Sequence, residues 1–167
     1  MQGVFSCFYS RQSGSKSRKK NFYIQVRECS KHRSGYRVSI GFTIGVHIKD
    51  LALLKLIKKY FGVGSITKLS NDAVQYRVYS VQDLKVIIDH FDKYPLLSKK
   101  LADYLLFKQA FKLVLLKEHL TEEGVLKIVA LKASINLGLS DKLKVLFPDI
   151  IPVQRPVVEV KPISNPQ

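Results

Sequence analysis

The stretch FYIQVR at residues 22–27 alternates apolar and polar side chains, and RVSIGFTI at residues 37–44 repeats the alternation after a polar, basic turn. A period of two is typical of a strand with one face buried and one face exposed. Two shorter strands are predicted at about residues 65–69 and 74–79, joined by a Ser-Asn-Asp turn. Together these segments predict a four-stranded antiparallel sheet with one polar face.

Each strand pair is followed by a segment with helical periodicity. Apolar residues recur at spacings of three and four in residues 51–61, after Asp50, which can cap that helix. The same spacing returns in residues 82–93, where Pro95 ends the helix. The rest of the domain is predicted to be helical, at residues 98–117 and 121–137 and in a short last helix that reaches residue 147. The order strand–strand–helix occurs twice, so the predicted fold class is α+β, with helices on one face of the sheet.

The composition narrows the possible functions. The chain has 167 residues with 28 Lys and Arg against 13 Asp and Glu, a formal net charge of +15, and 46% hydrophobic residues. Such a chain can bury a core, so wholesale disorder is excluded, and lysines interrupt every apolar run that could cross a membrane. Two cysteines cannot form a disulfide framework, and four scattered histidines lack neighbours at ligand spacing, so we expect no metal or other cofactor. The charge favours a polyanionic partner, nucleic acid before membrane.

Three regions differ in composition. Residues 1–20 contain serines and basic residues without an acid, which is typical of a flexible basic arm or of a partial organelle transit peptide. Residues 21–147 form the predicted packed domain. Residues 148–167 are rich in proline and predict an extended tail. A transit peptide would direct the protein to the mitochondrion or, alternatively, to the chloroplast.

The polar face of the predicted sheet combines side chains that bind nucleic acid. Arginines suit phosphates, amides suit base edges and tyrosines suit stacking. A plain solvated face would also alternate apolar and polar residues, but the near absence of acids favours a binding surface. The predicted contacts on the sheet are Tyr23, Gln25, Arg27, Arg37, Ser39, Thr43, Lys68, Gln75, Arg77 and Tyr79. Further basic contacts are predicted at Arg18, Lys19, Lys20, Lys31, Arg33, Lys99 and Lys100.

Several segments resemble the LAGLIDADG homing endonucleases of organellar introns. They are GYRV at residues 35–38, YFGVG at 60–64, KYPLL at 93–97, KKLADYLLF at 99–107 and KEHLTEEG at 117–124. The likeness covers about residues 21–138, the length of one αββαββα repeat. It implies a sheet that binds nucleic acid. It also matches Lys99 and Lys100 to basic residues of the family's second conserved segment.

The resemblance also implies where cleavage chemistry would lie. In this family the name motif is a helix before the first strand, and its terminal carboxylate holds divalent metal at the scissile phosphate. The matching stretch is QSGSKSRKKN at residues 12–21, which places Lys19 at the acid position, and no Asp or Glu precedes Glu28. An ammonium cannot coordinate a metal ion. We therefore expect a degenerate single repeat whose first helix is lost or altered, without catalytic residues. We also expect no symmetric dimer of the family's kind, because burying unpaired lysines is costly.

These observations predict a protein that is not an enzyme and that binds structured organellar RNA, as a ribosome-associated component or an intron-splicing helper. RNA is expected in preference to DNA, with other proteins of a ribonucleoprotein complex as further partners and no membrane association. Two alternatives stay open. One is an active endonuclease that cuts double-stranded DNA with Mg²⁺ using acids from a partner. The other is a DNA-binding regulator that does not cleave.

Overall fold

The structure, a computed structural model, describes residues 22–97, 99–136 and 138–158. Its elements follow the predicted order, with two strand–strand–helix units and then a helical remainder. The strands are β1 (Phe22–Glu28), β2 (Tyr36–His47), β3 (Ser65–Lys68) and β4 (Ala73–Val78). The helices are α2 (Leu51–Phe61), α3 (Val81–Lys93), α4 (Lys100–Leu115), α5 (Glu122–Ser134) and α6 (Asp141–Leu146), with 3-10 turns η1 (Ile48–Asp50) and η2 (Glu118–Leu120). The predicted basic arm and the position of the family's first helix lie outside the described residues.

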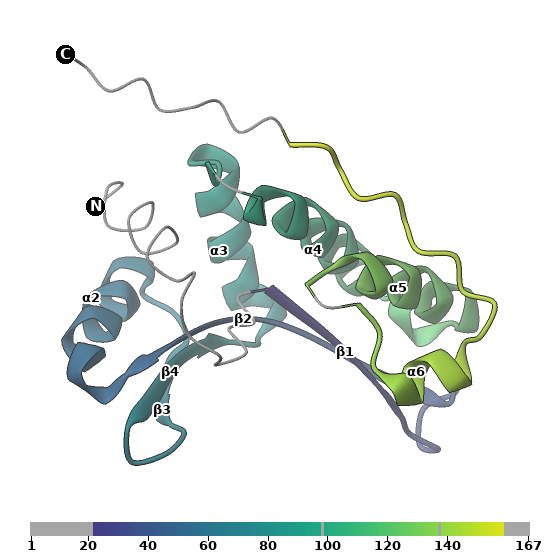
Figure 1. Ribbon diagram of the computed structural model, residues 1–167, viewed down its shortest axis with the longest axis horizontal. Helices are drawn as coiled ribbons and strands as arrows, with labels where there is room; N and C mark the ends of the chain where they lie inside the picture. The colour runs from purple at the N-terminus through teal and green to yellow at the C-terminus, as the bar shows by residue number, and fades with distance from the viewer. Residues whose placement is uncertain (1–21, 98, 137, 159–167) are drawn as a thin grey trace.

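The four strands form one antiparallel sheet in the order β1-β2-β4-β3, which confirms the predicted fold class. In the register, Phe42 of β2 lies opposite Phe22 of β1 on one side and opposite Val78 of β4 on the other. Figure 1 shows an arched sheet with α2, α3, α4 and α5 on one side. Among the described elements no helix covers the other, concave side of the sheet.

The core lies between the sheet and the helices. Phe22, at the start of β1, is fully buried. Its ring centroid lies 5.2–5.6 Å from those of four other aromatic side chains, Phe42, Phe91, Tyr104 and Phe107. Aromatic pairs at such distances add about 0.5–1.5 kcal/mol each to the gain from burial. Because the rings come from β1, β2, α3 and α4, this cluster fixes the start of β1 against the helices.

The two long helices after residue 98 are shorter than predicted. The helix predicted to reach residue 117 ends at Leu115, because Lys117 adopts a left-handed φ of 60°. The helix predicted to reach residue 137 ends at Ser134, and Asn136 is left-handed as well, with a φ of 52°. Left-handed residues stop a helix, and apolar periodicity does not reveal them in advance.

The turn between α4 and α5 is closed by a cap and a close backbone contact. Thr121 caps α5 as predicted, and its Oγ1 accepts a hydrogen bond from the N–H of Gly124 at 3.0 Å. A Cβ at position 124 would overlap the carbonyl of Glu118 in η2. Glycine is therefore needed there for close approach between η2 and the first turn of α5.

The segment after α6 packs against the helices. Residues 148–158 contain no helix or strand. Ile150 and Val153 nevertheless pack against the core, and the N–H of Val153 donates to the carbonyl of Ala130 in α5 at 3.2 Å. In Figure 1 this yellow segment passes along α5 and α4. The described part of the predicted tail is therefore attached to the helical layer.

Candidate nucleic-acid interface

The open face of the sheet carries polar, basic and aromatic side chains, and none of the described strand residues on it is acidic. In β1 and β4 buried residues alternate with less buried ones, and in β2 apolar residues that pack against the core alternate with polar residues and glycines. The antiparallel register gathers the residues that point away from the core on this side. The face consists of Tyr23, Gln25, Arg27, Arg37, Ser39, Gly41, Thr43, Ser65, Thr67, Gln75, Arg77 and Tyr79. We call this set the open face. Its charge is suited to a polyanion.

Two of the predicted sheet contacts are placed differently. Lys68 pairs with Val74, which is buried against the helices, so the prediction that Lys68 lies on the open face is wrong. β3 is an edge strand with little burial on either side, so polarity does not reveal which way its side chains face. Thr43 lies on the open face but is only 4% exposed, which leaves little of its side chain accessible to a ligand.

Two arginines lie directly opposite each other at one end of the open face. Arg27 of β1 pairs with Arg37 of β2, and both side chains are exposed. When the amide of Gln25 is oriented with its oxygen toward Arg27, that oxygen accepts hydrogen bonds from Arg27 Nη2 at 3.0 Å and Nε at 3.2 Å. Like charges directly opposite each other are destabilising. An anion that bridged the two guanidinium groups would relieve that repulsion, so this pair is suited to a phosphate.

An aromatic pair covers the middle of the open face. Gly41 of β2 pairs with Tyr23 of β1, and the ring of Tyr79 reaches the same glycine from the β4 side. The ring centroids of Tyr23 and Tyr79 are 5.6 Å apart with an interplanar angle of 89°, and the guanidinium of Arg77 lies 5.6 Å from the centre of the Tyr79 ring. Burial, together with the neighbouring Tyr79, raises the pKa of Tyr23. Tyr23 therefore stays neutral at physiological pH, although Arg27 and Arg77 lie close to it.

The other predicted basic contacts lie beside the sheet or beyond the described residues. Lys31 and Arg33 are exposed in the turn between β1 and β2, and Lys99 is exposed just before α4. Lys100 is engaged in an ion pair with Asp103 at 2.9 Å. Arg18, Lys19 and Lys20 fall outside the described residues.

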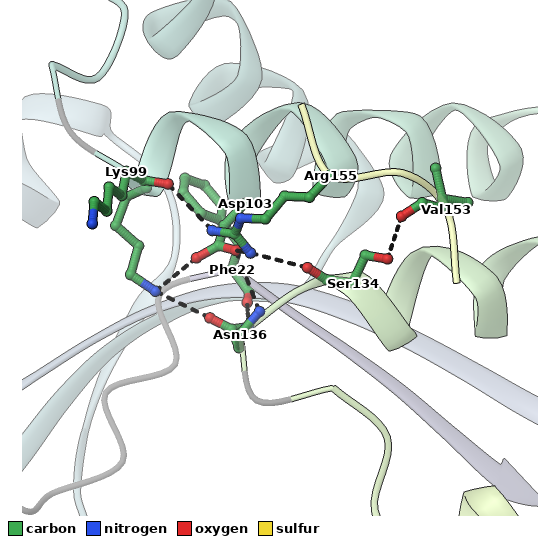
Figure 2. A network of polar contacts seen from close by, with 8 residues as sticks. Phe22, Lys99, Asp103, Ser134, Asn136, Val153 and Arg155 are labelled. Carbon is green, nitrogen blue, oxygen red and sulfur yellow. Dashed lines mark hydrogen bonds and ion pairs between the residues drawn. The ribbon is translucent and has the colours of Figure 1, made fainter. Parts of the chain in front are cut away.

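Sequence reasoning missed a polar cluster around the buried Asp103, next to the start of β1. Asp103 of α4 is 3% exposed and takes two ion pairs, from Lys100 Nζ to Oδ2 at 2.9 Å and from Arg155 Nη1 to Oδ1 at 2.8 Å. Arg155 also donates to the carbonyls of Ser134 at 3.0 Å and Lys99 at 3.3 Å. Figure 2 shows Arg155 reaching these groups from the C-terminal segment. We call Lys100, Asp103, Asn136 and Arg155 the Asp103 cluster.

The Asp103 cluster continues to the first residue of the sheet. Asn136 accepts from Lys100 Nζ at 3.1 Å, and its Nδ2 donates to the carbonyl of Phe22 at 2.7 Å (Figure 2). The hydroxyl of Ser134 donates to the carbonyl of Val153. These contacts join β1, α4, α5 and the C-terminal segment. The one available signal in the sequence was an acid within the apolar helix at residues 100–115.

The four histidines are dispersed over the described part of the chain. Burial lowers the pKa of His90 and of His119, and Nδ1 of His119 is buried without a hydrogen-bond partner. Among the described residues no group of three or more His, Cys, Asp and Glu side chains could hold a metal ion. In the same residues no helix is long and apolar enough to cross a membrane.

The four-stranded sheet and its helical backing define an α+β fold with one uncovered face. A family model described as LAGLIDADG endonuclease matches residues 20–111. "Probable intron-encoded endonuclease 3" of Neurospora crassa is 48% identical over 140 residues, which are 83% of this chain and 26% of that protein. An "Uncharacterized 50.9 kDa protein in ND4 intron 1" of Podospora anserina is 48% identical over 103 residues, 60% of this chain and 23% of that protein. The chain belongs to the LAGLIDADG endonuclease family.

Solved structures agree with this membership. The LAGLIDADG meganuclease I-CpaMI bound to uncleaved DNA is 44% identical with a TM-score of 0.83, over 87% of this chain and 50% of that one. The I-SmaMI LAGLIDADG homing endonuclease bound to cleaved DNA is 47% identical with a TM-score of 0.81, over 83% of this chain and 47% of that one. The chain spans about a quarter of these curated relatives and about half of the solved structures.

These comparisons correct the functional prediction. A non-enzymatic protein that prefers RNA was expected, but a close relative is named an endonuclease and the similar solved structures are bound to DNA. The prediction of an RNA-binding protein without catalysis, with a ribonucleoprotein complex as partner, is therefore wrong. Net charge could not distinguish the two nucleic acids, because both carry the same phosphate backbone.

Proposed function

We propose that this chain is one repeat of a LAGLIDADG homing endonuclease and binds double-stranded DNA along the open face of its sheet. The observation that carries the proposal is the acid-free face itself, on a scaffold that superposes with DNA-bound meganucleases at a TM-score of 0.83. The major groove of DNA, about 12 Å wide, admits a β-ribbon. Arg27, Arg37 and Arg77 would then contact phosphates or base edges.

Two features of the open face favour duplex DNA. Arginine and glutamine side chains are the groups that read guanine and adenine in the major groove. Gln25 lies on β1, and Gln75 and Arg77 lie on β4, with β2 between the two strands. The paired Arg27 and Arg37 would contact phosphates and so fix the position of the sheet along the DNA backbone. In A-form RNA the major groove is too deep and narrow for such side chains to reach the bases.

The described residues do not gather the acids that metal-dependent cleavage requires. The fold family implies carboxylates that hold a divalent metal ion, but the described residues contain no such cluster. The matching position in the sequence is Lys19, and no acid precedes Glu28. We therefore propose that the acids come from a partner, namely a second repeat. The span of about half of the two solved meganucleases supports this arrangement.

The first test is binding. The 167-residue chain is mixed with a pool of randomised 30-base-pair duplexes and with folded RNA at the same salt concentration. We expect a selected duplex to displace the RNA, with affinity falling roughly a thousandfold between 50 and 200 mM salt if about six phosphates are contacted. RNA that resists displacement by every selected duplex would overturn the proposal.

The second test is cleavage. The selected duplex is incubated with Mg²⁺ and the chain, alone and together with the remaining half of a two-repeat relative. We expect cutting in the mixture only. Cutting by the chain alone would show that it supplies its own acids, and no cutting in either sample would overturn the endonuclease proposal.

The relatives also bear on location. The Neurospora crassa relative is named intron-encoded, and other relatives are named after introns of ND4 and cox1. These names support the mitochondrial location expected from the sequence and give no support to the chloroplast. We propose that the protein acts in the mitochondrion.

A further inference from the structure

The row Tyr23–Gly41–Tyr79 crosses three neighbouring strands in the middle of a basic face, yet it carries no charged group. Tyr23 and Gly41 are paired in the register of β1 and β2, and Tyr79 continues the row directly after β4. Gly41 is buried because the two rings meet above it. Arg27 and Arg37 lie further along the same two strands, opposite each other. The arginines can therefore contact the phosphates of a bound duplex, and the aromatic row can contact the base edges between the two phosphate backbones.

Glycine at position 41 is what lets the two rings close. A Cβ there would overlap the Tyr23 ring and lie 2.5 Å from Cδ1 and 2.8 Å from Cε1 of Tyr79, distances at which a ring must move. The two rings instead meet edge to face at 5.6 Å. The result is a fixed aromatic ledge, and Tyr79 keeps 45% of its surface exposed on it.

We propose that this aromatic ledge is a specificity-determining element that reads the 5-methyl group of thymine in the major groove. The inference rests on the proposed binding of duplex DNA along the open face. Thymine carries the one apolar group that unmodified base pairs present in the major groove. An apolar ledge flanked by arginines would select for that group, because polar base edges placed against the rings would lose their water without gaining partners.

The test uses the intact chain and the duplex selected from the randomised pool. Each thymine of that duplex is replaced in turn by deoxyuridine, which differs only by the missing methyl group. We expect about fourfold weaker binding at one or two positions, the ratio that corresponds to the burial of one methyl group. Equal binding of the thymine and deoxyuridine duplexes at every position would overturn the proposal.

Variants connect the effect to the ledge. Tyr79→Ala should reduce the thymine-to-deoxyuridine ratio to about one, and Tyr79→Phe, which keeps the ring, should preserve it. Gly41→Ala keeps both tyrosines but displaces their rings, so it should also abolish the discrimination. Tyr60→Ala is the matched control, because Tyr60 is 41% exposed but lies on α2, on the opposite side of the sheet. A ratio that survives Tyr79→Ala would overturn the proposal, whereas failure to select any duplex would overturn the proposed function instead.

Discussion

Arg155 and Asp103 form an ion pair in which Nη1 of the arginine lies 2.8 Å from Oδ1 of the carboxylate. Asp103 is almost completely buried within the helical layer, whereas Arg155 belongs to the exposed C-terminal segment. A carboxylate removed from water stays ionised only with cations and hydrogen-bond donors around it. Arg155 therefore compensates a buried charge and, through the same contact, fastens the C-terminal segment to the domain.

Replacement of Arg155 should destabilise the fold. In Arg155→Ala the buried carboxylate keeps Lys100 but loses its second cation, and the carbonyls of Ser134 and Lys99 lose a donor. We expect the free energy of unfolding to fall by about 2 kcal/mol. Urea denaturation followed by circular dichroism measures it. Lys144→Ala, which removes an exposed ion pair with Asp141, is the control and should change stability by less than about 0.5 kcal/mol. Equal effects of the two variants would contradict this account.

The sheet and its helical backing could be predicted because burial imposes a period on the sequence. In β1, β2 and β4 apolar residues that pack against the core recur at every second position, so the open face could be predicted from the pattern. Lys68 was misplaced because β3 is an edge strand, where exposure on both sides removes the contrast that marks the faces.

The Asp103 cluster could not be predicted, because its members are far apart in the sequence. Lys100 and Asp103 are spaced for a helical ion pair, but nothing local connects Arg155 with Asp103, or Asn136 with the carbonyl of Phe22. The choice between RNA and DNA failed for a different reason. Charge and stacking groups suit either polymer, and the proposal of DNA rests on the comparison with solved structures that are bound to DNA.

Gly124→Ala should also destabilise the protein, although alanine is the better helix former. The intrinsic gain of alanine over glycine in a helix is about 0.5–1 kcal/mol. It is outweighed by overlap of the new Cβ with the backbone carbonyl of Glu118, which cannot move without opening the turn before α5. We expect a net loss of about 2 kcal/mol, in the range of overpacked cores.

The control for Gly124 is Gly45→Ala. Nothing lies within 4 Å of a Cβ at position 45, so this variant should keep or slightly raise the melting temperature. Calorimetry of both variants measures the difference. A melting temperature of Gly124→Ala at or above that of the unaltered chain would contradict the close contact.

Stability should decrease as the pH is lowered from 7 to 5. Burial lowers the pKa of His90 and of His119 in the native state below the ordinary value of 6.5. The unfolded chain therefore binds protons first, so the stabilisation is complete above about pH 6.5 and is lost as the pH falls toward the native pKa values. Each histidine can contribute at most about 1.4 kcal/mol per pH unit. Burial would raise the pKa of Asp92, but hydrogen bonds from Lys108 and Tyr104 outweigh this effect and lower it. Stability therefore also falls at lower pH, where the unfolded chain protonates Asp92 before the native protein does.

The histidine account is tested with the double variant His90→Gln and His119→Gln. Urea unfolding at pH 5, 6, 7 and 8 should give a flatter pH dependence between 5 and 7 than in the unaltered chain. His47→Gln is the control, because His47 is exposed at the end of β2. A double variant with an unchanged slope would show that other groups cause the decrease.

The opposed arginines of the open face should affect binding and stability in opposite directions. In Arg37→Ala one of two facing like charges is removed, so the protein without DNA should keep its stability or gain a few tenths of a kcal/mol. Binding of the selected duplex should nevertheless weaken about tenfold at low salt, and the slope of log affinity against log salt should fall by about one. Lys58→Ala is the matched control, since Lys58 is also exposed but lies on α2, on the other side of the sheet. If Arg37→Ala and Arg27→Ala both bound DNA as the Lys58 variant does, the open face would not be the surface that DNA occupies.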